Sequence, residues 1–224
     1  MGKFFQETLK PILVVIIVAC TFRSAIADWN DVPTGSMKPT ILEGDRILVN
    51  KLAYDLRIPF TRWRLVEWDT PSHGDIVVFF SPDKNVRMVK RIVGVPGDVL
   101  RLRNNQLYVN GKRAAYHALD DEIIRQIDPS QRDRHRFAFE AIEGEDHPIM
   151  LTPGHGRRRS FPTITVPADH YFVMGDSRDN SRDSRWFGFV SSESIVGRTT
   201  RVALSLDPSH WFLPRWDRLL MRLP

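Results

Sequence analysis

Cysteine is almost absent from this sequence: Cys20 is the only one among 224 residues. A single cysteine excludes an internal disulfide and a metal site built from cysteines. The seven histidines do not show the HExxH spacing of zinc peptidases, and no other zinc pattern is present. We therefore expect neither a metal nor another cofactor.

An excess of charge of one sign is also lacking. There are 32 lysines and arginines against 27 acidic residues, which gives a net charge of +5. The arginines in the middle of the chain alternate with acids, and the run Arg157–Arg159 is typical of a solvated loop. This mixing argues against a nucleic-acid partner. The length suits one core domain with a small insertion.

One long apolar run is present, from Leu9 to Ala27. As a helix it would measure about 28 Å, close to the roughly 30 Å of a hydrocarbon core. Lys3 and Lys10 lie before or at the start of the run and Asp28 and Asp31 follow it, so the positive-inside rule places residues 1–8 in the cytoplasm and the domain after the run outside. A cleavable secretory signal ending near Ala27 fits the same pattern. Both interpretations export residues 28–224.

The exported part is expected to be mainly β, with an antiparallel sheet as its core, because β-branched and alternating runs dominate and no βαβ alternation occurs. The predicted core covers residues 28–112 and 164–210. Residues 113–163 are polar and predict an insertion with one weak helix, 118–127. The tail, 211–224, is either the end of the core or an interfacial anchor. The predicted strands are 46–50, 75–80, 86–93, 99–103, 106–109, 164–166, 171–174 and 195–204.

One lysine lies among apolar residues. In the predicted strand 86–93, side chains alternate between two faces, which places Lys90 with Met88 and Ile92. At a sheet edge such a lysine would bend out to water and cover apolar surface with its stem. In a dry site, desolvation would lower its pKa and leave a neutral amine that can act as a general base.

A small hydroxyl near the apolar run could be the partner of that amine. Ser36 lies in the stretch PTGSMKPT, residues 33–40, after a glycine that lets the backbone approach a substrate. The Ser36 N–H and the Thr34 hydroxyl could together stabilise an oxyanion. Lys38 is a competing base, but the residue before a proline favours extended backbone, so we expect it to face solvent. A triad that uses Asp169 and His170 is a further alternative.

Four segments together resemble the type I signal peptidases, which are membrane-bound serine proteases that remove signal peptides. The segments are PTGSMKPT at 33–40, GDIVV at 74–78, VKRIVGVPGD at 89–98 and GDSRDNSRDSR at 175–185. The resemblance implies a Ser36 nucleophile, a Lys90 general base and Thr34 at the oxyanion hole. It also implies that Ser181 orients the lysine and that Asp183 and Arg185 form a supporting ion pair. Asp176 lies in the same segment.

The resemblance further implies a substrate and a location. Val32, Ile47, Val77 and Val89 match positions that line small pockets, and such pockets select Ala-x-Ala by excluding larger side chains. The partners would be the signal peptides of preproteins and the lipid bilayer, with the secretion machinery as a further candidate. The enzyme would be a single-pass protein of the inner (plasma) membrane with its catalytic domain outside.

Several alternatives stay open at this point. They are a peptidase of the same chemistry with a narrow client set, a non-catalytic anchored binding protein, and a soluble hydrolase released after Ala27. Many larger relatives have two membrane spans where one is predicted here, and the insertion lacks the cysteines that some relatives carry. The oligomeric state and the role of residues 113–163 do not follow from the sequence.

Overall fold

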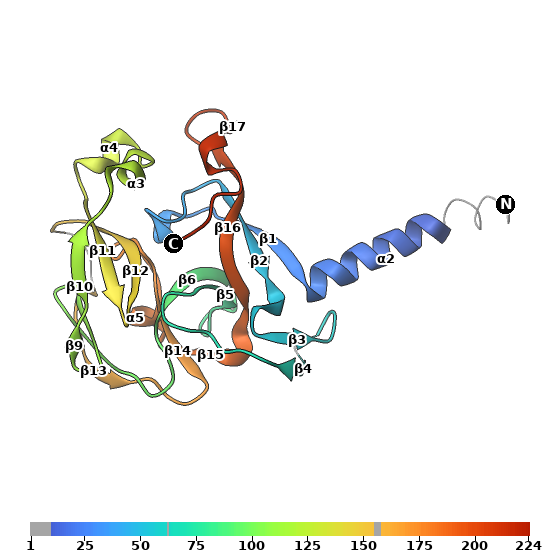
Figure 1. The fold of residues 1–224 in the computed structure, drawn as a ribbon, viewed down its shortest axis with the longest axis horizontal. Helices are drawn as coiled ribbons and strands as arrows, with labels where there is room; N and C mark the ends of the chain where they lie inside the picture. The colour runs from blue at the N-terminus through green and yellow to red at the C-terminus, as the bar shows by residue number, and fades with distance from the viewer. Residues whose placement is uncertain (1–9, 62, 155–157) are drawn as a thin grey trace.

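The computed structural model describes residues 10–61, 63–154 and 158–224, and these residues form a mainly β protein (Figure 1). Its antiparallel sheets agree with the predicted fold class. The strands are β1 (Ala27–Asp31), β2 (Asp45–Asn50), β3 (Asp55–Arg57), β4 (Arg64–Glu67), β5 (Ile76–Phe80), β6 (Arg87–Gly94), β7 (Val99–Arg103), β8 (Gln106–Val109), β9 (Lys112–Arg113), β10 (Ala115–Ala118), β11 (Arg136–Ile142), β12 (Glu145–Leu151), β13 (Phe161–Thr165), β14 (His170–Met174), β15 (Val190–Ser191), β16 (Ile195–Asp207) and β17 (Leu213–Pro214).

Within the described residues, eight strands form the main sheet in the order β1-β2-β16-β5-β6-β14-β15, with β17 paired to β16. Each strand pairs antiparallel with its neighbours. Alternation explains why these segments form a sheet over a core. In β2, for example, Ile47 and Val49 are buried, while Leu48 between them and Asn50 after them are exposed. The strand β6, which carries Lys90, lies inside this sheet between β5 and β14.

Two smaller sheets pack beside the main one (Figure 1). One has the order β13-β7-β8-β9, and β13 begins at Phe161, so this sheet resumes three residues before the predicted core boundary at residue 164. The other, β10-β11-β12, lies wholly within the predicted insertion and contains the hairpin β11–β12, which the sequence analysis did not predict.

The helix predicted for residues 118–127 is much shorter in the structure. Residues 115–118 form β10, and α3 covers only Asp121–Arg125. A second short helix, α4 (Pro129–Arg132), follows at once because the Asp128 side chain accepts a hydrogen bond from the Ser130 N–H and caps it. The long helical prediction was therefore wrong at both ends.

The N-terminal helix α2 (Lys10–Ala25) projects away from the sheets (Figure 1). It ends before the predicted span does, because Ala27 already belongs to β1 and pairs with Asn50 of β2. Among the residues that the structure describes, no helix is both long enough and apolar enough to cross a bilayer. The predicted cytoplasmic segment 1–8 and Leu9 lie outside the described residues.

The C-terminal tail divides into two kinds of residue. Leu223 is buried in the core, and Arg218 is buried in an ion pair with Asp45. Trp211 and Trp216 are 95% and 73% exposed. The tail therefore contributes to the core through Leu223 and Arg218, and the interfacial anchor stays a prediction.

Candidate active site

Ser36 lies in a single turn of 3-10 helix, Gly35–Met37, that follows β1. The turn is held on both sides of the serine. Met37 is 1% exposed and packs in the same core cluster as Val32, and the Ser36 carbonyl accepts a hydrogen bond of 3.1 Å from the Ser177 N–H. The Ser36 side chain is left half-buried at the edge of a cavity.

Lys90 of β6 reaches that serine. The Lys90 side chain is 2% exposed, and its Nζ lies 2.7 Å from Ser36 Oγ and 2.8 Å from the Val89 carbonyl oxygen. Burial lowers the pKa of Lys90 to about 8, against smaller opposing effects of the Asp183 and Asp176 carboxylates. The lysine is therefore buried rather than bent out to water, and it can lose its proton near neutral pH.

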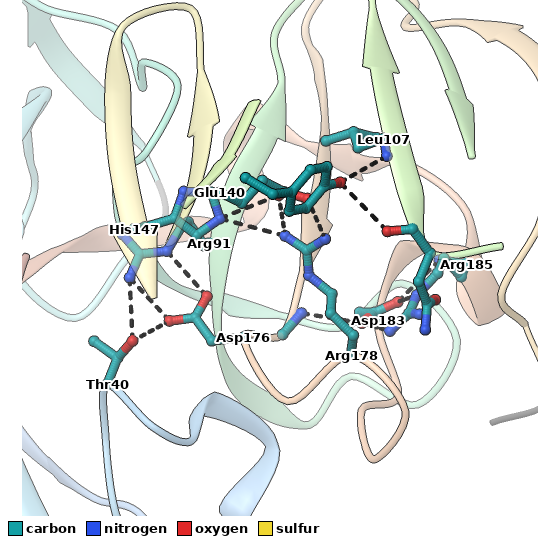
Figure 2. Close-up of polar contacts among 12 residues, drawn as sticks. Thr40, Arg91, Leu107, Glu140, His147, Asp176, Arg178, Asp183 and Arg185 are labelled. Atoms are coloured by element: carbon teal, nitrogen blue, oxygen red, sulfur yellow. Dashed lines mark hydrogen bonds and ion pairs between the residues drawn. The ribbon is translucent and has the colours of Figure 1, made fainter. Parts of the chain in front are cut away.

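The C-terminal half of β6 is buried on the face opposite Lys90 as well, which the alternating pattern did not reveal. Arg91 is 1% exposed and binds Asp176 with two hydrogen bonds, of 3.0 and 2.9 Å. Its third nitrogen donates to the Gly74 carbonyl and to an oxygen of Pro224, and Thr40 donates to Asp176 (Figure 2). Sequence reasoning missed Arg91; an arginine within an apolar strand was the signal that could have found it.

The segment 175–185 contacts the nucleophile turn through the hydrogen bond from Ser177 to Ser36. Figure 2 shows the polar contacts of Asp176, Arg178, Asp183 and Arg185 in this segment. Asp183 and Arg185 form a buried ion pair with two hydrogen bonds of 2.8 Å. Burial raises the pKa of Asp183, but the hydrogen bond and charge of Arg185 and a bond from the Gly175 N–H outweigh it, so the pKa lies below its usual range. Asp183 is thus an anion close enough to Lys90 to influence its pKa.

The predicted role of Ser181 has less support. The hydrogen bonds assigned to Lys90 Nζ go to Ser36 and Val89. Ser181 Oγ is buried and makes no hydrogen bond to Lys90, but it lies close enough to Asp183 to help lower the pKa of that carboxyl. Ser181 still packs close to the nucleophile turn, since a Cβ added at Gly175 would collide with both Ser181 and the Ser36 carbonyl.

A cavity of about 440 Å³ opens beside the dyad. Val32, Thr34 and Val89 line it, together with Ser36 and Lys90. Thr34 Oγ1 lies 3.5 Å from Ser36 Oγ, on the exposed side of the turn.

Two of the four predicted pocket residues lie elsewhere. Ile47 and Val77 are fully buried in core clusters and do not line this cavity. The alternation of β2 turns Ile47 toward the core, and Val77 is enclosed in the middle of β5, opposite Lys90 in register.

The competing bases are occupied or distant. The Lys38 side chain is 11% exposed, contrary to the solvent-facing position that we expected. Its Nζ contacts Glu43 Oε2 and Gln131 Oε1, both at 3.1 Å, because the insertion covers it. His170 Nδ1 contacts the Ala168 carbonyl oxygen, and neither Asp169 nor His170 lines the cavity. Of the amines and imidazoles considered from the sequence, Lys90 is the one in contact with Ser36.

Known proteins that are similar to this chain identify its family. The model of the family "Signal peptidase, peptidase S26" matches residues 5–204. This chain belongs to the signal peptidase family. Proteins named signal peptidase I from Pseudomonas fluorescens and Pseudomonas aeruginosa are 36% and 35% identical to it, and each match covers 96% of this chain and 77% of the relative. A signal peptidase I crystal structure from Enterococcus faecalis is 30% identical, over 58% of this chain and 97% of that chain, with a TM-score of 0.35.

Membership of this family makes the chain an enzyme, a serine endopeptidase among the hydrolases. The matched region contains Ser36, Lys90 and the whole 175–185 segment, so the dyad and its surroundings lie within the part of the chain that the family shares.

Proposed function

We propose that this protein removes signal peptides from exported preproteins with a Ser36–Lys90 dyad. The observation that carries the proposal is the 2.7 Å contact between Lys90 Nζ and Ser36 Oγ in a site where the lysine is almost completely buried. A neutral amine at that distance is within the range over which a general base accepts a hydroxyl proton.

The proton moves in a closed cycle. Neutral Lys90 accepts the Ser36 hydroxyl proton as Oγ bonds to the scissile carbonyl carbon, and the carbonyl oxygen becomes an oxyanion. The resulting ammonium then donates that proton to the leaving amine, and an ester to Ser36 remains. Lys90, neutral again, accepts a proton from water as the water oxygen attacks the ester carbonyl. The ester bond then breaks, the signal peptide leaves as a carboxylate, and Lys90 returns the proton to Ser36 Oγ. The Thr34 hydroxyl and the Ser36 N–H would stabilise both oxyanions.

The residues beside the dyad favour small substrate side chains. Val32 and Val89 line the cavity next to Ser36 and Lys90, and a wall of branched apolar residues accepts methyl groups and excludes larger ones. This supports cleavage after an Ala-x-Ala sequence. Ile47 belongs to the core cluster that contains Val32 and against which Val89 packs, whereas Val77 belongs to another cluster.

Attachment to a membrane is part of the same proposal. The side chains of five consecutive residues of α2, Ile12–Ile16, are each at least 50% exposed, so apolar surface surrounds the helix on all sides. Such a helix gains stability from an apolar environment rather than from water. Sodium carbonate extraction and N-terminal sequencing of the protein from cells test this: we expect a membrane-bound protein with its N-terminal segment intact. An N-terminus at Asp28 would contradict it.

The central test is cleavage of a preprotein that carries an Ala-x-Ala site by the full chain in detergent, from pH 6 to 10. We expect the wild type and Lys38→Ala to cleave, and Ser36→Ala and Lys90→Ala to be inactive. Activity should rise with pH through about 8, because only the neutral form of Lys90 accepts a proton.

Each alternative gives a different result. Cleavage by Lys90→Ala at a rate near the wild type would show that another group is the base. A wild type that leaves this preprotein intact at every pH, but cleaves others, would indicate a narrow client set. A wild type that forms no acyl-enzyme on any substrate would indicate a binding protein.

A further inference from the structure

The insertion contains a row of polar side chains, of which two are buried and one is half-buried. Tyr116 of β10, Glu140 of β11 and His147 of β12 lie directly opposite one another in the register of the three strands. Residues opposite one another in adjacent strands point to the same face of a sheet. Tyr116 OH donates to Glu140 Oε1 at 2.7 Å, and His147 Nε2 lies 3.3 Å from Glu140 Oε2.

This row of side chains contacts Arg178, which belongs to the segment 175–185 beside the dyad. Arg178 donates from both terminal nitrogens to the two carboxylate oxygens of Glu140, with a distance of 2.8 Å for the first (Figure 2). Glu140, His147 and Arg178 are each at most 2% exposed. A bidentate arginine–carboxylate pair fixes orientation as well as distance, so this contact sets where Arg178 lies.

The backbone around Arg178 is bonded to the insertion on one side and to the nucleophile on the other. The Met150 N–H of β12 donates to the Asp176 carbonyl at 2.9 Å, and the Arg178 N–H donates to the Met150 carbonyl at 3.0 Å. Between these two bonds, the Ser177 N–H donates to the Ser36 carbonyl. One short segment, 176–178, thus connects the insertion to the turn that carries Ser36.

The charge states of Glu140 and His147 favour the contact with Arg178. Burial raises the pKa of Glu140, but the charge of Arg178 and the hydrogen bonds from His147 and Arg178 outweigh it and hold the pKa well below its usual range. Burial and the nearby Arg91 lower the pKa of His147, so the imidazole is neutral. Glu140 is therefore the buried anion that balances Arg178, and removing it would leave a buried cation unpaired.

We propose that the insertion is a brace for the nucleophile: Tyr116, Glu140 and His147 hold Arg178, and residues 176–178 in turn hold the Ser36 turn against Lys90. These three are positioning residues, since each acts through Arg178. The insertion would thus contribute to catalysis, and the kinetic part of the test rests on the proposed function.

The test compares Glu140→Gln with Asp146→Asn in the full chain in detergent. Asp146 neighbours His147 on β12 but is exposed, so its variant is a matched control. At a temperature where both are folded, we expect Glu140→Gln to lower kcat at least about tenfold with KM within about twofold, because displacement of a reacting group affects the chemical step. Hydrogen–deuterium exchange should rise in peptides that contain residues 33–38 and 175–179, and not in β16. The control should change neither readout.

Both readouts have to change. Unchanged kcat in a folded Glu140→Gln variant, or a lower kcat without faster exchange at residues 175–179, would overturn the brace. If Glu140→Gln does not fold, the variant Tyr116→Phe replaces it. This variant removes one hydrogen bond to Glu140, so the same changes are expected at a smaller size. If the wild type cleaves no preprotein, the proposed function fails, but the exchange measurement still decides the brace.

Discussion

At the residue scale, the buried amine of Lys90 makes folding stability depend on pH. Its pKa is near 8 in the folded chain and 10.5 without burial, so the unfolded chain binds more protons between these values. The free energy of unfolding should therefore rise with pH across this window, by about 3 kcal/mol in total. Below pH 8 the folded protein keeps a charged ammonium in a dry site, which destabilises it.

The variant Lys90→Met tests this directly. It lacks the titrating amine, so we expect it to be more stable than the wild type at pH 7, and the difference should shrink as the pH rises to 10.5. Chemical denaturation at several pH values measures it, with Lys112→Met at an exposed position as the control. A stability difference that stays constant over pH 7 to 10.5 would mean that burial does not lower the pKa of Lys90.

Gly175 is the residue whose missing side chain matters most to the site. A Cβ at this position would fall well inside contact distance of the Ser36 carbonyl oxygen and of Ser181. The backbone at Gly175 is not left-handed, so a side chain there would cause steric crowding but no strain in the backbone. We expect Gly175→Ala to fold but to lower kcat about a hundredfold, because the Ser36 turn has to move. Cleavage at wild-type rate would show that the turn tolerates the shift.

At the element scale, Arg91 joins four parts of the chain that are distant in sequence. It contacts Asp176, Thr40, the Gly74 carbonyl and Pro224. Lysine has one nitrogen and cannot reproduce the bidentate pair. We expect Arg91→Lys to lower the free energy of unfolding by about 2–4 kcal/mol. The exposed Arg101→Lys on β7 should change it by less than about 0.5 kcal/mol. Equal effects in the two variants would contradict a central role for Arg91.

Local sequence patterns were enough to predict the strand that carries Lys90 and to draw attention to the turn that carries Ser36. Alternation in β6 placed Lys90 among apolar neighbours, and the glycine before Ser36 indicated an exposed turn. The same alternation failed for Arg91, because a strand inside a sheet that is covered on both sides has no solvent face. The row of Tyr116, Glu140 and His147 depends on the register of three strands, which no local pattern specifies.

At the scale of the whole molecule, one hairpin indicates which side of the catalytic domain would face a bilayer. The hairpin β3–β4 lies beside the C-terminal end of α2 (Figure 1), and the Phe60 N–H donates to Ser24 Oγ of that helix at 2.8 Å. Phe60 and Trp63 at its tip are each 74% exposed. If α2 is in the membrane, its end brings these aromatic side chains to the interfacial layer, which tryptophan prefers.

Single-tryptophan variants of the full chain in liposomes with brominated lipid test this orientation. All six tryptophans are at least 41% exposed, so replacing five of them with phenylalanine should leave the core intact. We expect the fluorescence of Trp63 to be quenched strongly. Trp186 of α5 (Ser184–Phe187) lies on the side of the molecule away from α2 (Figure 1), so it should be quenched little. Equal quenching of the two would mean that the hairpin does not face the lipid, and that α2 alone sets the distance between Ser36 and the membrane.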